Sequence, residues 1–416
     1  MKIHQNLEKM VNTKTSYVFV FLEIFAGEGG IQSYVKDIWR AYLGLPDSEL
    51  AQVFLLRDRP IGDNPFESKN LKFHYFKSLH PMLGRMKLSA SLLACLWRQR
   101  PTHVFCGHIN LAPLVRTICQ PFDIPYTILT YGKEVWEPLP QPYQRALKQA
   151  DGIWTISRYS RDRLCSSNEI DRKQVQLLPC CVDGDAFTPG PKPKALVERY
   201  GLEGAKVLMT VARLWSGDIY KGVDVTIRAL SAIAKVFPNV KYLVIGRGDD
   251  RPRLAQLAQD LGVGDRVIFA GFVPTEDLVE HYRVAYAYIM PSQEGFGIVY
   301  LEAMACGVTV LSGDADGSAD PLQDGRLGWR VPHRDPEAVA AACIEILKGD
   351  DQRCNGQWLR QESLAHFGRD ALVQQLKELL AKTRTQGLEK SKVKSQKKIG
   401  ARGQGTGGRI VDFISI

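Results

Sequence analysis

Residues 285–311 read AYAYIMPSQEGFGIVYLEAMACGVTVL, and this stretch indicates the fold of the chain. It predicts a short buried strand that ends at Met290, then a glycine-rich loop, then a helix that begins near Ile298. Glycine residues at such a turn let backbone N–H groups approach an anion, and the N-terminus of the helix contributes about half a positive charge. The stretch therefore predicts a phosphate-binding turn at the carboxyl end of a strand.

The same alternation of short apolar runs and helical segments continues through most of the 416 residues. It is typical of right-handed βαβ units and parallel sheets. The candidate strands fall into two sets, with 17–22, 50–57, 102–106, 125–130, 152–156 and 174–178 in the first and 207–212, 240–245, 266–270, 285–290, 308–311 and 326–331 in the second. We therefore expect an α/β fold of two Rossmann-like, doubly wound domains that face each other across a cleft.

Six parts are expected along the chain, because a stretch rich in proline, glycine and lysine separates the two sets of strands. These parts are a polar leader (1–16), an N-terminal domain (17–185), a linker (186–205), a C-terminal domain (206–365), a helix that crosses back to the N-terminal domain (366–384) and a basic tail (385–416). The net charge of +9 is partly concentrated in that tail, whose composition is that of a disordered segment. No interleaving of aromatic and basic residues accompanies the charge, so we expect no nucleic-acid partner.

Cysteine usage and hydropathy indicate a cytoplasmic protein. The nine cysteines show none of the CxxC spacings that build zinc or redox sites, and we expect them to be reduced thiols. The most apolar run, 17–25, is interrupted by Glu23 and follows a polar leader, so it is a poor signal peptide and too short to span a bilayer. We interpret it as a buried strand.

Two carboxylates accompany the predicted phosphate-binding turn. Glu294 lies in the loop, and Glu302 lies one turn into the helix, on the same side as Ile298, so both can face one ligand. Beside a phosphate, carboxylates suit sugar hydroxyls rather than the phosphate itself. On the residues alone, the alternative is a polar helix start at which Glu294 is merely solvated.

Glu294 and Glu302, embedded in EGFGIVYLEAMACG, resemble the acidic signature of the family-four retaining glycosyltransferases of the GT-B fold, the glycosyl transferase group 1. The resemblance extends over roughly residues 17–382. It implies that Glu294 contacts the transferred sugar and Glu302 the ribose of the nucleotide. The residues that it places against the donor at this turn are Gly295, Phe296, Gly297 and Ile298.

Two cations fit the same family pattern. The segment 207–222, VLMTVARLWSGDIYKG, resembles the family's strand followed by Arg and Lys-Gly, here Arg213 and Lys221 with a longer intervening loop. Cations at the end of a strand suit a leaving diphosphate, whose charge grows as the glycosidic bond breaks. The alternative is two ordinary surface cations. Asp314 and Asp316 form an Asp-x-Asp pair, but we expect no metal ion, because Arg213 and Lys221 supply the positive charge.

Further donor contacts follow from the resemblance. The residues that look like the family's nucleotide-pocket strands and first-loop glycine pair are Gly246, Phe272, Val273, Gly29 and Gly30. Gly246-x-Gly248 lacks the third glycine of a dinucleotide fingerprint, which argues against NAD. Phe272 as an ordinary core residue and Gly29-Gly30 as a merely structural turn are the alternatives.

The acceptor side carries one match and one departure. His108 ends a strand and resembles the family's active-site histidine, although a lone histidine is more often structural. Residues 131–134, Tyr-Gly-Lys-Glu, resemble a family His-Gly-x-Glu turn in which Tyr131 replaces the histidine. This loop faces the acceptor in the family, so the replacement bears on which acceptor is used.

The resemblance implies a retaining, metal-independent transfer of a hexose from a UDP- or GDP-linked donor to a hydroxyl acceptor, a glycan or lipid-linked glycan. The nucleotide sugar is a substrate, and no cofactor is expected. We expect front-face attack without a protein nucleophile, with His108 against the sugar. A GT-B sugar phosphorylase or nucleotide-sugar epimerase remains one alternative, and a non-catalytic nucleotide-sugar-binding protein remains another. Incubation of the donor alone, with a search for epimerised or phosphate-split product, distinguishes the first alternative from a glycosyltransferase.

A membrane contact is a further alternative. Arg85, Lys87, Arg98 and Arg100 bracket an apolar helix at 88–97. Basic flanks with leucine and tryptophan can seat a helix on an anionic bilayer, here the inner face of the membrane. We favour a packed core helix with basic ends.

Overall fold

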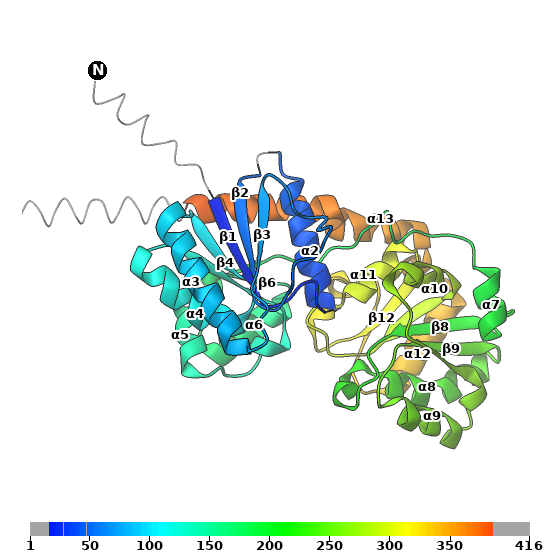
Figure 1. Ribbon diagram of the computed structural model, residues 1–416. Helices are drawn as coiled ribbons and strands as arrows, with labels where there is room; N and C mark the ends of the chain where they lie inside the picture. The colour runs from blue at the N-terminus through cyan, green and yellow to red at the C-terminus, as the bar shows by residue number, and fades with distance from the viewer. Residues whose placement is uncertain (1–15, 28, 47, 386–416) are drawn as a thin grey trace, which may run out of the picture.

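Two parallel sheets organise the residues that the structure, a computed structural model, describes, which are 16–27, 29–46 and 48–385. Figure 1 shows the N-terminal domain in blue and cyan and the C-terminal domain in green and yellow. The expected polar leader and basic tail lie outside the described residues, apart from Ser16 and Thr385. Within the described ranges, no helix combines the length and the apolarity that a membrane crossing requires.

The N-terminal domain contains a seven-stranded sheet in the order β3-β2-β1-β4-β5-β6-β7. Its strands are β1 (Ser16–Phe21), β2 (Leu50–Leu55), β3 (Leu71–Tyr75), β4 (His103–Cys106), β5 (Tyr126–Thr130), β6 (Gly152–Thr155) and β7 (Val175–Leu177). Its helices are α2 (Gly30–Leu43), α3 (Pro81–Gln99), α4 (Ala112–Cys119), α5 (Gln141–Gln149) and α6 (Arg158–Asn168). All strand pairs are parallel, so every loop after a strand lies at one edge of the sheet.

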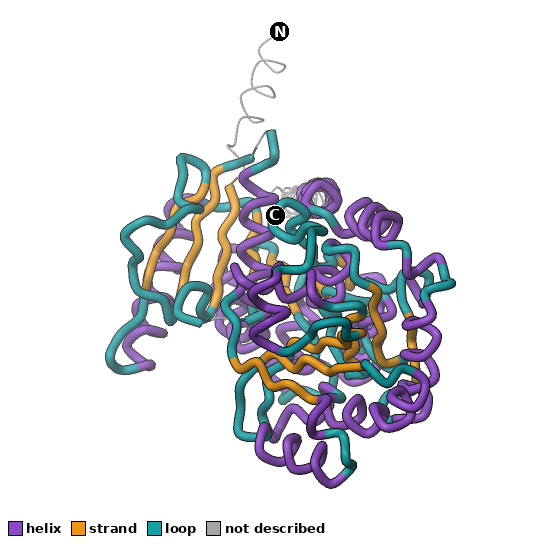
Figure 2. The backbone as a smooth tube through the Cα atoms, turned by 90° about the vertical axis from the view of Figure 1, so that its right-hand side faces the viewer, coloured by secondary structure: helices purple, strands orange, loops and turns teal. Residues whose placement is uncertain are grey.

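The C-terminal domain contains a six-stranded parallel sheet in the order β10-β9-β8-β11-β12-β13. Its strands are β8 (Lys206–Val211), β9 (Val240–Ile245), β10 (Val267–Gly271), β11 (Ala287–Met290), β12 (Thr309–Gly313) and β13 (Trp329–Val331). Its helices are α7 (Lys194–Tyr200), α8 (Val223–Val236), α9 (Arg251–Asp260), α10 (Leu278–Val284), α11 (Ile298–Ala305), α12 (Pro336–Lys348) and α13 (Gly356–Phe367). The expected fold of two doubly wound, Rossmann-like domains is confirmed (Figures 1 and 2).

Hydrophobic burial on both faces of each sheet explains why the strands read as continuous apolar runs. In β1, Tyr17, Phe19 and Phe21 belong to one core cluster, whereas Val18 and Val20 belong to the cluster on the opposite face. Successive side chains of a strand point to opposite faces, so one strand supports two helical layers.

Three elements were not predicted from the sequence. β3 is an edge strand that is buried on one face only, because the side chains of Lys72 and His74 on its other face are exposed. Helix α7 lies within the expected linker, between Pro193 and a left-handed Gly201. Helix α13 precedes the predicted last helix, which the structure describes over 369–385.

The two crossings between the domains lie side by side. The amide of Val182 donates to the carbonyl of Phe367 at 2.9 Å, and Val182 forms a parallel bridge with Gly368. The guanidinium of Arg360 donates to the carbonyls of Gly184 and Phe187, each at 2.6 Å. Helix 369–385 then lies along the N-terminal domain (Figure 1), where Arg384 contacts Tyr17. The adjacent crossings join the domains at one place and leave the strand ends facing each other.

Candidate active site

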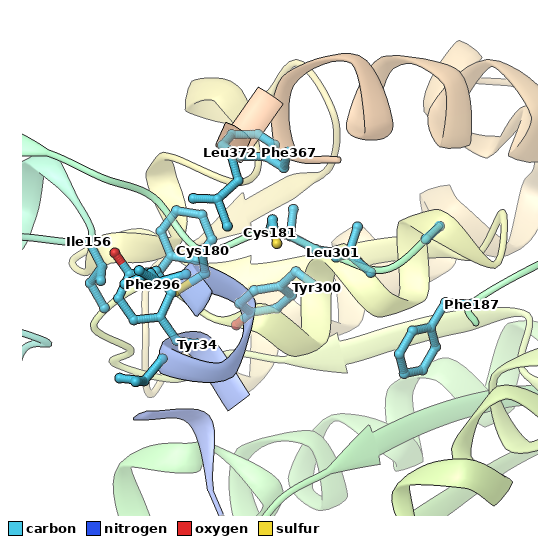
Figure 3. Packing of buried hydrophobic residues seen from close by; sticks show 14 of the residues in the cluster. Tyr34, Ile156, Cys180, Cys181, Phe187, Phe296, Tyr300, Leu301, Phe367 and Leu372 are labelled. Atoms are coloured by element: carbon cyan, nitrogen blue, oxygen red, sulfur yellow. The ribbon is translucent and has the colours of Figure 1, made fainter. Parts of the chain in front are cut away.

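A cavity of 290 Å³ lies between the two domains, at the carboxyl ends of both sheets. The residues that line it from the N-terminal domain are Gly30, Ile31, Tyr34, Tyr131, Ile156 and Cys180. Those from the C-terminal domain are Val211, Lys221, Met290, Glu294, Gly295, Phe296, Gly297, Ile298 and Val299. Figure 3 shows Tyr34, Ile156, Cys180 and Phe296 gathered at this junction. Ligands of doubly wound folds bind in such crevices.

The structure brings seven of the predicted site residues together around the cavity. They are Gly30, Lys221, Glu294, Gly295, Phe296, Gly297 and Ile298. The other seven predicted residues do not line the cavity. These residues are His108, Arg213, Gly29, Gly246, Phe272, Val273 and Glu302. The turn before α11 therefore forms the centre of the site.

Lys221 and Glu294 form an ion pair through the ammonium Nζ and the carboxylate Oε1. Their side chains are only 20% and 16% exposed, so the pair is screened from water. Lys221 ends the 3₁₀ segment Ser216–Lys221 after β8, and Glu294 lies in the loop after the neighbouring strand β11. The pair therefore neutralises two charges that both project into the cleft.

The turn that carries Glu294 requires glycine at two positions. A Cβ atom on Gly295 would lie 2.6 Å from the carbonyl oxygen of Tyr131, so this glycine lets the two domains approach closely. Gly297 has φ +96°, and a Cβ atom there would meet the ring of Tyr300 at 2.4 Å. Because α11 begins directly afterwards, the turn exposes its first N–H groups next to the cavity.

Asp316 stabilises the turn that carries Glu294. Its carboxylate accepts hydrogen bonds from the amide of Glu294 at 2.6 Å and from the amide of Ser318 at 2.9 Å. Burial raises the pKa of Asp316 to about 6. Among the described residues, no group of three or more His, Cys, Asp or Glu side chains could hold a metal ion. The carboxylate of Asp316 is thus occupied by two backbone amides and by the hydroxyl of Ser318.

Arg213 lies beside the main cavity rather than in it. Its Nε donates to the Oδ2 of Asp218 at 2.6 Å, and its side chain is 66% exposed. Arg213 and Lys221 line a second, much smaller hollow along the 3₁₀ segment. The longer loop noted in the sequence folds into this segment, which ends at Lys221, whereas Arg213 lies between β8 and the segment.

Glu302 lies behind the cavity. The hydroxyl of Tyr282 donates to its Oε2 at 2.7 Å, and burial raises the pKa of Glu302 to about 7. The sequence placed Glu302 on the same side of the helix as Ile298, but it carried no information about Tyr282. The expected contact between Glu302 and a ribose stays a prediction.

His108 lies directly after β4 in the N-terminal domain. Its Nδ1 accepts the amide of Asn110 at 3.1 Å, so the proton resides on Nε2. Burial lowers the pKa of His108, and nearby Arg57 lowers it further. The ring centroid of Tyr131, which lines the cavity, lies 6.4 Å away, and its hydroxyl donates to the carbonyl of Gly107 at 2.7 Å.

Asp58 is a site residue that the sequence analysis missed. Its side chain is fully buried and accepts the amides of Ile24, Phe25 and Ala26 at 2.7 to 2.9 Å. These bonds fix the loop that leads to the Gly29-Gly30 turn. The position of an acidic residue directly after the predicted strand at 50–57 could have identified Asp58 as a candidate site residue.

The predicted nucleotide-base residues lie at the edge of the C-terminal sheet. The amide of Gly246 donates to the carbonyl of Gly271 at 2.8 Å. Phe272 is 50% exposed, and the guanidinium of Arg247 lies 4.5 Å from its ring centroid. Phe272 is therefore an accessible aromatic surface and not a core residue.

Glu302 predicts a specific pH dependence of stability. Its folded pKa of about 7 lies above the ordinary value of 4.5, so its contribution is fully present below pH 4.5 and is lost as the pH rises through 7. Glu302→Gln removes this titration and keeps an acceptor for Tyr282. Urea unfolding should show that the stability advantage of the variant grows by about 2 kcal/mol between pH 5 and pH 8. An equal difference at both pH values would contradict the assigned burial.

Comparison with known proteins finds a family match within the C-terminal domain. Residues 205–349 match the family described as "Glycosyl transferases group 1". The fold matches that of Anabaena HepE, solved in complex with UDP and glucose, with a TM-score of 0.69 and 18% identity over 88% of this chain and 100% of that chain.

Two bacterial relatives are similar in sequence. A "GDP-mannose-dependent alpha-(1-6)-phosphatidylinositol monomannoside mannosyltransferase" of Mycolicibacterium smegmatis is 36% identical over 52% of this chain and 59% of its own length. A "GDP-mannose-dependent monoacylated alpha-(1-6)-phosphatidylinositol monomannoside mannosyltransferase" of Corynebacterium glutamicum is 28% identical over 77% of this chain and 85% of its own length. Residues 205–349 thus resemble the glycosyl transferases group 1 family, and the chain has the two-domain GT-B fold. The chain spans less than two thirds of the length of the Mycolicibacterium relative.

Proposed function

We propose that the protein is a retaining glycosyltransferase that moves a hexose from a UDP- or GDP-linked donor to a hydroxyl acceptor. The observation that carries this proposal is the Lys221–Glu294 ion pair, held at the glycine turn before α11 in the interdomain cavity. An ammonium group, a carboxylate and the N-terminus of a helix together match a diphosphate joined to a sugar. The family match of the C-terminal domain supports the same activity.

The mechanism that we propose uses binding and charge rather than a protein nucleophile. Lys221 would neutralise the leaving diphosphate, and Glu294, released from Lys221, would accept hydrogen bonds from sugar hydroxyls. Arg213 would add charge at the same edge once it parts from Asp218. His108 would donate its Nε2 proton toward the sugar, because Nδ1 is already occupied by Asn110. The leaving phosphate would assist deprotonation of the acceptor on the same face.

Substitution of the ion pair tests these roles. Lys221→Ala and Glu294→Ala should each lower kcat/KM for transfer by on the order of 100-fold, because each removes a charged contact of the transition state. Lys235→Ala, an exposed cation on α8, is the matched control and should keep full activity. Thermal unfolding of each variant checks the fold. Near-normal turnover by Lys221→Ala or Glu294→Ala would overturn the assignment.

We also propose that the transfer requires no metal ion, because Lys221, Arg213 and the helix N-terminus supply the positive charge. Incubation with EDTA followed by desalting should leave the transfer rate unchanged. A large loss of rate that added Mg²⁺ or Mn²⁺ restores would contradict this proposal.

We propose a lipid-linked acceptor and a site of action at the inner face of the membrane. The two relatives named above carry a phosphatidylinositol mannoside in their names. Helix α3 also presents an exposed apolar surface, in which Met82 is 75% and Trp97 66% exposed, and Leu79, just before the helix, is 93% exposed. Its other face, with Leu88 and Leu92, is packed in the core. The expected core helix and the membrane alternative thus describe opposite faces of α3.

Charge on α3 suits an anionic bilayer. Arg85, Lys87, Arg98 and Arg100 are all exposed beside the apolar side chains. Cosedimentation should show binding to vesicles that contain phosphatidylglycerol and weak binding to pure phosphatidylcholine. Reversing Arg85 and Lys87 to Glu should weaken binding by about 1 kcal/mol or more per charge.

Two controls distinguish vesicle binding through α3 from vesicle binding through other parts of the chain. Val236→Ser removes a half-exposed apolar side chain from the C-terminal domain and should leave vesicle binding intact. Truncation after Thr385 removes the basic tail. If the truncated chain loses all vesicle binding while the charge-reversed variant keeps it, α3 is not the contact surface.

A further inference from the structure

Lys133 reaches across the mouth of the cleft from the N-terminal domain. It begins the 3₁₀ segment Lys133–Val135 after β5, and the buried carboxylate of Glu134 fixes that turn by accepting the amide of Tyr131. The Nζ of Lys133 lies 2.9 Å from the ring centroid of Tyr220, in the C-terminal domain. The Nζ of Lys221 lies 5.3 Å from the same ring. Two ammonium groups from opposite domains therefore meet at one aromatic side chain.

The neighbours of Lys133 belong to the donor half of the site. The carbonyl of Tyr220 accepts the amide of Gln293, so the ring stands beside the loop that carries Glu294. Glu294 and Asp218 are close enough to act on the charge of Lys133, but each already has a cationic partner. Within the described part of the chain, Lys133 forms no ion pair of its own. Burial lowers the pKa of Lys133, and Lys221 lowers it further against the effect of the two carboxylates.

The charged side chains around Tyr220 indicate the charge of the ligand that this part of the cleft would bind. Lys133, Lys221 and Arg213 supply three positive charges, and Asp218 and Glu294 supply two negative ones. The N-terminus of α11 adds further positive potential on the same side. The excess is one positive charge together with the potential of the helix N-terminus, and an anionic group such as a phosphate would satisfy it. An aromatic ring binds an ammonium group only weakly, and a phosphate oxygen would replace it readily.

We propose that Lys133 is a third cation for the diphosphate of the nucleotide sugar, and that a phosphate oxygen replaces the Tyr220 ring as its partner when the donor binds. The proposal rests on the glycosyltransferase function proposed above. The flexible stem of lysine allows the ammonium group to move from the ring to a phosphate beside Lys221 without a change in the backbone. Because Lys133 comes from the opposite domain, this contact would tie both domains to one ligand and favour the closed cleft.

Lys133→Met tests the proposal, because methionine keeps an unbranched stem and removes the charge. Isothermal titration should show that the variant binds UDP or GDP about tenfold or more weakly than the wild type does, since a charged hydrogen bond is lost. Uridine and guanosine, which lack phosphate, should bind both proteins equally. Lys133→Arg should keep most of the affinity. Lys148→Met, on the outer helix α5, is the charge-matched control and should bind as the wild type does.

The outcomes separate this proposal from the function on which it rests. If the wild type binds a nucleoside diphosphate and Lys133→Met binds it equally well, the role of Lys133 is wrong and the function stands. If Lys133→Met raises only the KM for the acceptor, the cation serves an acceptor phosphate and the donor assignment is overturned. If the wild type neither binds a nucleoside diphosphate nor transfers sugar, the proposed function fails first. Thermal unfolding confirms that each variant is folded.

Discussion

The ion pair between Lys221 and Glu294 is the interaction on which the geometry of the cleft depends. It joins the loops that follow β8 and β11, two neighbouring strands of the C-terminal sheet. Burying either charge alone would be costly, and the pair keeps both charges in place. A ligand that carries both a diphosphate and a sugar offers each partner a replacement. The same pair thus stabilises the turn at the cavity and places two groups that suit a donor.

The surrounding residues hold this pair at the junction of the two domains. Asp316 binds the amide of Glu294, and Gly295 allows the backbone of the N-terminal domain to pass close by. On the far side of the cleft, Arg158 pairs with Asp320 and Asp324 of the C-terminal domain. These ion pairs add to the crossings at residues 182–184 and 367–369 and to a hydrophobic cluster that contains buried side chains of both domains. The two domains are therefore held together both by continuous chain and by contacts between their facing surfaces.

The sequence predicted much of this arrangement because local patterns determine it. The two sets of apolar runs correspond to two parallel sheets, and the glycine turn of 294–297 lies at the cavity as its position after a strand requires. The rest depends on contacts between distant residues. Tyr282 lies 20 positions before Glu302, and Asp58 lies 32 to 34 positions after the amides it binds. Lys133 meets Tyr220 only because two domains fold and face each other, so no spacing in the chain could reveal it.

The most direct test of this account is the stability of the wild-type protein and of Lys221→Ala in the presence of nucleoside diphosphate sugars. A donor at 100 times its dissociation constant stabilises a folded protein by about 2.7 kcal/mol. Thermal unfolding with UDP-glucose and with GDP-mannose should show that shift for one of them in the wild type and a much smaller shift in Lys221→Ala. An absence of stabilisation by every nucleoside diphosphate sugar, or an equal shift in both proteins, would contradict the account.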